Sequence, residues 1–260
     1  MPEITTTYLV LATPRSGSTL LGQALNSTNL AGDPREHFGH KMNFWAEKWG
    51  TTTLAAFVDR LMQERATDNG AFGAKLLYSH LVHLEQVARR EAKYADLPLA
   101  DILASLFPNL HYLHITRRNT TRQAISYWKA KQTGVWGQDE APRAGRTGQG
   151  RRKEVKGSRQ TGVEPVYDFD GINALYTAVR EEDAAIDAYF AKSGITPMRV
   201  VYEDFTKTYE ETTRAMLDFL GITLPPDIEL GQPRTARLAD DTSEAWAARF
   251  DAERAERGIS

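Results

Sequence analysis

Residues 6–19 read TTYLVLATPRSGST, and this stretch decides the fold. Its first part, residues 6–13, is apolar and rich in residues that favour β-structure, so we expect a buried strand that ends at Pro14. A helical pattern begins at Ser18 and continues to about Asn26. A buried strand that turns directly into a helix is typical of α/β proteins, and the turn presents backbone N–H groups to a ligand.

The turn itself, residues 13–19, has the composition of an anion-binding loop. Gly17 lets the backbone approach a ligand closely, and Arg15 carries a guanidinium group that can hold two phosphate or sulfate oxygens. Three hydroxyl side chains add hydrogen-bond donors: Ser16, Ser18 and Thr19. The structural alternative is a polar strand-to-helix turn in which a serine caps the helix.

The loop differs from the nucleoside triphosphate loop G-x-x-x-x-G-K-[ST]. Gly17 and Thr19 fit its sixth and eighth positions, but Ala12 replaces the first glycine and Ser18 replaces the lysine. Loss of that lysine removes the charge that holds the β- and γ-phosphates of ATP. The cation lies instead at Arg15, so the loop suits an anion but is poorly built for ATP with magnesium.

The rest of the chain alternates between strand and helix patterns. Further strands are expected at 72–76, 111–116 and 198–202, and further helices at 52–66, 79–91, 99–107, 120–132, 170–192 and 205–220. This alternation predicts the α/β class, with a P-loop-like, mostly parallel sheet and helices on both faces. No repeat or domain boundary is evident, so we expect a single domain over residues 1–260.

Composition excludes several functions. The hydrophobic content of 41% and the net charge of −2 fit a globular protein and disfavour nucleic-acid binding. The longest apolar run near the start, Tyr8–Ala12, is too short for a membrane span or a secretory signal. The chain has no cysteine, which fits a cytoplasmic protein, and its six histidines show no HExxH spacing, so we expect no metal.

One segment interrupts the pattern. Residues 137–165 contain six glycines, and within them residues 143–159 carry seven basic side chains against Glu154 alone. We expect a flexible surface insertion. It is either a solvated segment without a role or an electrostatic lid over an anionic ligand.

A second basic cluster follows the strand at 111–116. Arg117 and Arg118 come at its end, and Arg122 and Ser126 share a face of the next helix. Ligands of open α/β sheets bind at the carboxyl ends of the strands, so this cluster and Arg15 are expected to face one crevice. Such a crevice would suit a nucleotide with phosphates at both its 3′ and 5′ carbons. Alternatively, the arginines only pair with surface carboxylates.

These residues resemble a known family. The loop TPRSGSTLL resembles the 5′-phosphosulfate-binding loop of sulfotransferases that use 3′-phosphoadenosine-5′-phosphosulfate (PAPS), and RRNTTRQAISYW resembles their 3′-phosphate-binding element. Further blocks resemble the bacterial trehalose 2-sulfotransferase family, in the family's order and from residue 8 to about 246: YLVLATPRSGSTLL, AGDPREHF, GAKLLY, QAISYWKAKQTGVW and LADDTSEAW.

The resemblance implies the sulfotransferase fold, a reaction and a set of site residues. The reaction is transfer of a sulfuryl group from PAPS to a hydroxyl of a small carbohydrate-like acceptor, trehalose or a related glycoside, without a metal and in a possible homodimer. The residues that would hold the 5′-phosphosulfate are Arg15, Ser16, Gly17, Ser18 and Thr19. The residues that would hold the 3′-phosphate are Ser126 and one of Arg117 or Arg118. The acceptor itself stays open.

The resemblance also assigns the catalytic carboxylate. Glu36 falls where the family has its catalytic glutamate and would act as general base, although the residues alone favour a first-turn helix acid. Lys75 would add charge at the transferring group, or is a surface lysine. His37, Tyr78 and Trp128 are candidates for acceptor contacts, or belong to the wall and core. Two other functions remain: a small-molecule kinase, and a non-catalytic nucleotide-binding protein of the same fold.

Overall fold

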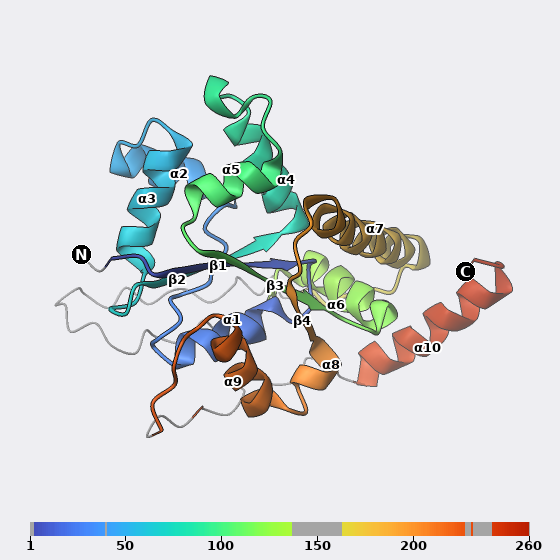
Figure 1. Ribbon diagram of the computed structural model, residues 1–260. Helices are drawn as coiled ribbons and strands as arrows, with labels where there is room; N and C mark the ends of the chain where they lie inside the picture. Colours follow the sequence, from blue (N-terminus) through green and yellow to red (C-terminus); the bar gives the residue numbers. More distant parts are fainter. Residues whose placement is uncertain (1–2, 40, 137–162, 227–229, 231–240, 260) are drawn as a thin grey trace.

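The computed structural model describes residues 3–39, 41–136, 163–226, 230 and 241–259. The basic segment 143–159 lies outside the described residues, as does most of the predicted insertion at 137–165. In the described part, four strands form one sheet in the order β2-β1-β3-β4 (Figure 1). Their bounds are Thr6–Ala12 for β1, Ala71–Leu77 for β2, Leu110–Thr116 for β3 and Met198–Val201 for β4.

All three strand pairs are parallel, so the carboxyl ends of the strands lie at one edge of the sheet. The described helices are α1 (Ser18–Ser27), α2 (Met42–Trp49), α3 (Leu54–Arg65), α4 (Tyr78–Ala88), the 3-10 turn η1 (Ala92–Tyr94), α5 (Leu99–Leu106), α6 (Thr120–Thr133), α7 (Phe169–Ser193), α8 (Tyr202–Phe205), α9 (Tyr209–Phe219) and α10 (Asp241–Glu256).

The side chains of β1 alternate between two cores, one on each face of the sheet. Leu9 and Leu11 join the cluster made with α3, α4, α5 and α7. Tyr8 and Val10 join the cluster made with α1 and α9. This alternation follows from the two-residue period of a strand, and a strand buried on both faces reads as a continuous apolar run. The predicted α/β class with helices on both faces is therefore confirmed.

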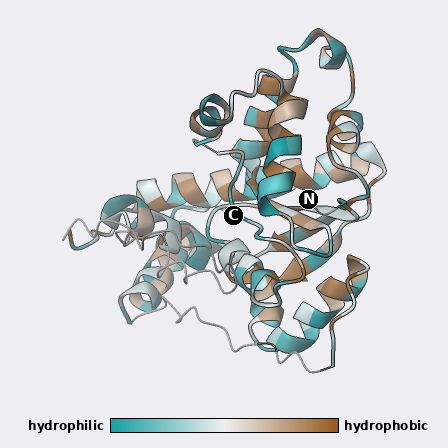
Figure 2. Cartoon of the chain, turned by 90° about the vertical axis from the view of Figure 1, so that its left-hand side faces the viewer, coloured by the Kyte–Doolittle hydropathy of each residue, from teal (hydrophilic) through white to brown (hydrophobic). Residues whose placement is uncertain are grey.

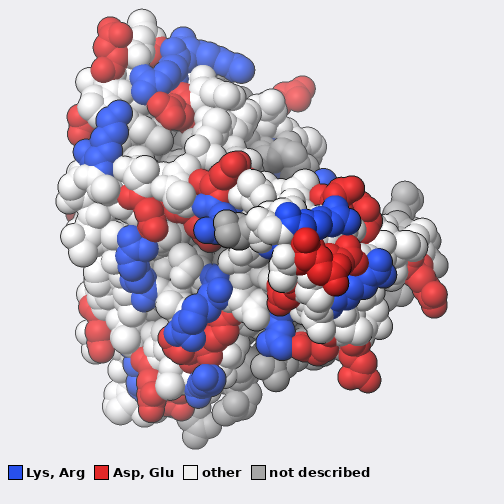
Figure 3. All heavy atoms as spheres, turned by 90° about the vertical axis from the view of Figure 1, so that its right-hand side faces the viewer, with Lys and Arg blue, Asp and Glu red and all other residues white. Residues whose placement is uncertain are grey.

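The surface mixes polar and apolar character. Figure 2 shows that the helices around the sheet carry both hydrophilic and hydrophobic residues. Figure 3 shows lysine and arginine side chains interspersed with aspartate and glutamate on the face that carries α10. No helix in the described ranges combines the length and apolar character needed to cross a lipid bilayer.

The elements differ from the sequence prediction in three places. The helix expected at 205–220 begins only at Tyr209, as α9, because Thr208 before it has a non-helical backbone (φ −119°, ψ 46°), and the short helix α8 that precedes it was not predicted. The helices α2 and α10 were not predicted. α10 lacks a strong apolar stripe, whereas α2 has one that includes Met42, Trp45 and Trp49 but is only eight residues long. The remaining predicted strands and helices are present, with ends shifted by up to three residues.

Candidate functional site

The loop after β1 has the backbone geometry of a tight turn that opens a helix. Arg15 and Gly17 both have left-handed backbones, with φ of 65° and 101°. Gly17 is the N-cap of α1 and has no side chain to cap it, so the first N–H groups of α1 lack a side-chain acceptor at the cap. A Cβ atom at Gly17 would lie 2.4 Å from Cδ2 of Tyr202. Only glycine therefore fits this position, and the helix end is open to an anion.

The three hydroxyl residues of the loop occupy different environments. Ser16 is fully buried, and its Oγ has no hydrogen-bond partner among the described residues. Ser18 is also buried, whereas Thr19 is exposed. A buried hydroxyl without a partner is costly unless a ligand or water forms a hydrogen bond with it. The Ser16 hydroxyl is therefore available to bind a polar ligand inside the loop.

Arg15 joins the loop to α6. Its Nε donates a hydrogen bond of 2.9 Å to Oγ of Ser126, and its guanidinium also donates to the backbone carbonyl of Trp136. Burial lowers the pKa of Arg15, and the nearby charge of Arg117 lowers it further, against an opposing effect of Tyr202. Two like charges held together with partial burial favour a bound anion.

Arg117 and Arg118 point to different places. Arg117 donates to the Arg15 carbonyl oxygen at 3.3 Å and lies over the ring of Tyr202, 4.9 Å from its centroid. Arg118 pairs with Asp204 on the exposed side of α8. The surface-pair alternative thus describes Arg118, while Arg117 lies beside the loop. Arg122, which was grouped with them, forms an ion pair with Glu244 of α10.

The segment that carries Glu36 lies along the outer edge of β2. Arg35 forms an isolated parallel bridge with Ala74, and the Lys75 N–H donates to the Arg35 carbonyl at 2.9 Å. This pairing places Glu36 beside Lys75, with 2.8 Å between Oε1 and Nζ. The alternative in which Glu36 is an acid in the first turn of a helix is therefore wrong, because residue 36 lies outside any helix.

Lys75 links Glu36 to the loop. It is largely buried on β2, and its Nζ also donates to Oγ1 of Thr19 at 3.3 Å. Two connected groups consequently lie along the carboxyl edge of the sheet. One runs from Ser126 to Arg15, the other from Thr19 through Lys75 to Glu36, and the loop after β1 contains a member of each.

The three residues predicted to contact the acceptor lie at different distances from the loop: His37 and Tyr78 are near Glu36 and the end of β2, and Trp128 is in a separate cluster. Nε2 of His37 lies 3.0 Å from the Asp33 carbonyl oxygen, next in the chain to Glu36. Tyr78 begins α4 directly after β2 and is half-buried against the core. Trp128 packs in a third cluster with α7 and α10, and its Nε1 donates to the Val166 carbonyl at 2.9 Å. The structure does not group Trp128 with the loop.

Sequence reasoning missed two neighbours of the loop. Tyr202 contacts Gly17 and Arg117 from α8, 185 positions after Gly17 by their numbers, and no motif pointed to it. Gln123 on α6 donates to Thr13 and to Pro14. Its position one turn before Ser126 was a signal that could have drawn attention to it.

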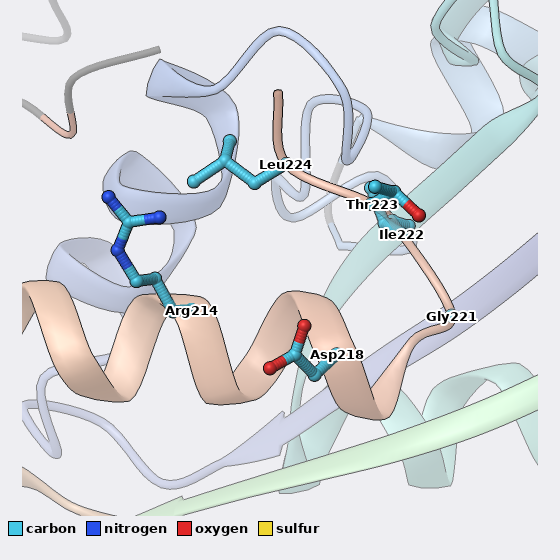
Figure 4. Close-up of a pocket in the computed structure, with 6 residues that line it drawn as sticks. All are labelled: Arg214, Asp218, Gly221, Ile222, Thr223 and Leu224. Atoms are coloured by element: carbon cyan, nitrogen blue, oxygen red, sulfur yellow. The ribbon is translucent and has the colours of Figure 1, made fainter. Parts of the chain in front are cut away.

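A surface depression lies elsewhere on the molecule. Figure 4 shows Arg214 and Asp218 of α9 beside the turn that follows this helix, Gly221–Leu224. None of the predicted site residues lines it. Within the described ranges, no group of three or more histidine, aspartate or glutamate side chains is arranged to hold a metal ion.

Fold and geometry define a parallel α/β protein with a cationic, hydroxyl-lined loop at the carboxyl edge of its sheet. Comparison with known proteins then gives the family: the chain belongs to the Stf0 sulphotransferase family, whose model matches residues 7–253. Membership supports a transferase that acts on sulfuryl groups.

Two named relatives match over nearly the full length. A trehalose 2-sulfotransferase of Mycobacterium tuberculosis (strain ATCC 35801 / TMC 107 / Erdman) is 27% identical over 279 residues, which cover 97% of both chains. A trehalose 2-sulfotransferase of Mycolicibacterium smegmatis is 28% identical over 292 residues, covering 98% of both. A solved structure, the sulfotransferase domain from the Synechococcus PCC 7002 olefin synthase, matches with a TM-score of 0.41 and 15% identity, over 97% of this chain and 89% of that one.

Proposed function

We propose that this protein transfers a sulfuryl group from PAPS to a hydroxyl of a small carbohydrate-like acceptor, with Glu36 as the general base. The observation that carries the proposal is the arrangement of the two connected groups at one sheet edge. Ser126 bonds to Arg15 at 2.9 Å, and Lys75 lies 2.8 Å from Glu36 while reaching Thr19 of the same loop. The proposed anion site and the Glu36 carboxylate are therefore both connected to the loop after β1, the carboxylate through Lys75.

The donor has two anionic ends, and the loop and α6 offer a partner for each. The open N-terminus of α1 and the buried hydroxyl of Ser16 suit the 5′-phosphosulfate. Ser126 and Arg117 suit the 3′-phosphate. Arg117 is preferred over Arg118 because Arg118 is already paired with Asp204 on the surface, whereas Arg117 lies against the loop.

In the proposed reaction, Glu36 takes the proton of the acceptor hydroxyl while the acceptor oxygen bonds to sulfur. The bond between sulfur and the bridging phosphate oxygen breaks, and adenosine 3′,5′-bisphosphate leaves. Arg15 and Lys75 would stabilise the charge that develops on the bridging and sulfuryl oxygens. In this arrangement Lys75 also orients the Glu36 carboxylate through their ion pair.

The acceptor proposal rests on similarity to the relatives and on the positions of two side chains. The names of both full-length relatives favour trehalose or a related glycoside. His37 and Tyr78 lie next to Glu36 and to the end of β2, so they are the candidates for acceptor contacts. The family resemblance further favours a homodimer, and the absence of cysteine favours the cytoplasm as its place of action.

The test combines turnover with binding. Labelled PAPS and a panel of sugars including trehalose would be assayed with the wild type and with Glu36→Gln. We expect turnover to fall by about a hundredfold or more, the usual contribution of a general base. Affinity for adenosine 3′,5′-bisphosphate, measured by calorimetry, should change little. Glu64→Gln is the matched control, because Glu64 pairs with Arg60 on the surface of α3, away from the proposed site residues.

The outcomes separate the alternatives. Wild-type turnover in Glu36→Gln would refute the base assignment. Tight binding of ATP with magnesium, without binding of the bisphosphate, would favour a kinase. Binding of the bisphosphate without sulfuryl transfer to any acceptor would favour a non-catalytic protein.

A further inference from the structure

A buried glutamine side chain connects helix α6 to the start of the loop after β1. Gln123 on α6 is completely buried, and its Nε2 donates two hydrogen bonds, to Oγ1 of Thr13 at 2.9 Å and to the Pro14 carbonyl oxygen at 2.8 Å. Thr13 and Pro14 are the two residues between β1 and Arg15. One turn further along α6 lies Ser126, the hydrogen-bond partner of Arg15.

The polarity of these bonds fixes the orientation of the amide. The Pro14 carbonyl only accepts, so a reversed amide would place two carbonyl oxygens against each other. The Oε1 of Gln123 has no partner among the described residues, so nothing in this part of the chain competes for the amide. Contact with the loop is what holds this side chain in place.

Thr13 is completely buried where it begins the loop. Its hydroxyl accepts the hydrogen bond from Gln123. Thr13 is therefore tied to α6, and it cannot shift away from this helix without breaking a buried hydrogen bond.

We propose that Gln123 is a positioning residue. Through Thr13 and Pro14 it fixes the spacing between the loop and Ser126, so that one nucleotide can bind with its 5′- and 3′-phosphates at the same time. This inference rests on the proposed function, since it concerns a donor with two anionic ends. Gln123 itself touches neither end.

The experiment measures the contribution of the 3′-phosphate. Calorimetry on the full-length protein gives the affinities for adenosine 3′,5′-bisphosphate and for adenosine 5′-monophosphate, and their ratio reports the 3′-phosphate. Gln123→Met keeps most of the side-chain volume and removes both hydrogen bonds. We expect the ratio to fall about tenfold, of the order expected from one or two lost hydrogen bonds, while the monophosphate affinity changes less than about threefold.

The control is Ile125→Val, a buried change on the same helix that leaves the loop contacts intact. It should lower the melting temperature without changing the ratio. If Gln123→Met weakens both nucleotides equally, with the ratio unchanged, the role is structural only and the inference is overturned.

A second variant covers failure of Gln123→Met to fold. Thr13→Val keeps the shape of the side chain and leaves the bond from Gln123 to Pro14 in place, so a smaller drop of about threefold in the ratio is expected. An unchanged ratio would again refute the inference. A wild type without preference for the bisphosphate would overturn the proposed function and this inference with it. A preference that both variants retain would overturn this inference alone.

Discussion

Gly17 has a left-handed backbone with φ of 101°, and a methyl group added there would lie 2.4 Å from the ring of Tyr202. Gly17→Ala should therefore lower the free energy of unfolding by more than the backbone strain alone, which is about 1–2 kcal/mol. Gly194→Ala is the control, because Gly194 has φ of 64° and nothing within 4 Å of an added Cβ.

Urea unfolding of both variants measures the difference. Gly17→Ala should also bind adenosine 3′,5′-bisphosphate more weakly, because the ring of Tyr202 must move and Arg117 lies over it. Equal destabilisation by the two substitutions would contradict this prediction. It would mean that the Tyr202 ring moves aside without a free-energy cost, so that the close contact at Gly17 does not contribute to stability.

Single residues also show where sequence reasoning reaches its limit. The pattern around residues 13–19 predicts the loop correctly because strand, turn and helix are local. Arg117 and Arg118 are adjacent and chemically identical, so only the direction of each side chain separates the one beside the loop from the one on the surface. The pairing of Glu36 with Lys75 depends on an edge bridge between distant segments, which no spacing in the sequence encodes.

At the scale of elements, α6 depends on its N-cap. The Asn119 side chain accepts a hydrogen bond of 2.8 Å from the Arg122 N–H. Asn119→Ala should lower the free energy of unfolding by about 1 kcal/mol, and Asn119→Asp should retain most of it. Because α6 carries Gln123 and Ser126, Asn119→Ala should also weaken binding of adenosine 3′,5′-bisphosphate.

Thr53→Ala supplies the comparison for this change. Thr53 caps α3 with a similar bond of 3.2 Å to the Ala56 N–H, but α3 carries none of the proposed site residues. It should cost a similar amount of stability in urea unfolding and leave nucleotide affinity unchanged. A loss of affinity in both variants would show that the effect on binding reflects stability in general.

Elements with a strong pattern are predictable, and those held by other means are not. The strands β1 and β2 were found because nearly all of their residues are buried, on both faces of the sheet. In contrast, α10 buries only two apolar side chains, Ala247 and Phe250, among the residues described for it. It otherwise packs through arginines over aromatic rings: Arg249 over Tyr167 at 3.9 Å and Arg254 over Tyr176 at 4.2 Å. A search for the periodicity of apolar residues does not detect contacts between arginines and aromatic rings, so α10 was not predicted.

On the scale of the whole molecule, the long helix α7 and the strand β3 carry buried or half-buried titratable groups whose pKa shifts have opposite effects on stability. Burial, partly offset by Asp187, lowers the pKa of His114 to about 4, and the charge of Arg199 acts in the same direction as burial. Burial raises the pKa of Asp183 to about 6, with the Thr13 hydrogen bond opposing and Asp187 adding to the rise. Burial and the charge of Asp183 raise the pKa of Glu182 to about 6.

These shifts have opposite consequences for stability on acidification. Between pH values of about 6.5 and 4, unfolded His114 binds a proton that the folded protein excludes, so its contribution to stability is lost as the pH falls. Asp183 has an ordinary pKa of 3.8, so from about pH 6 down to that value the folded protein binds the extra proton and gains stability. Glu182 acts in the same sense as Asp183. The two effects partly cancel in the wild type.

Single substitutions should reveal each effect separately. Urea unfolding at pH 7 and pH 5 gives the change in stability on acidification. Asp183→Asn removes the part of the acid-side gain that Asp183 contributes, so this variant should lose more stability than the wild type between pH 7 and pH 5. His114→Gln removes the acid-side loss, so it should lose less, or gain. If the two variants and the wild type change by the same amount, neither group titrates in this window, and the burial of His114 between β3 and α7 has no consequence for stability.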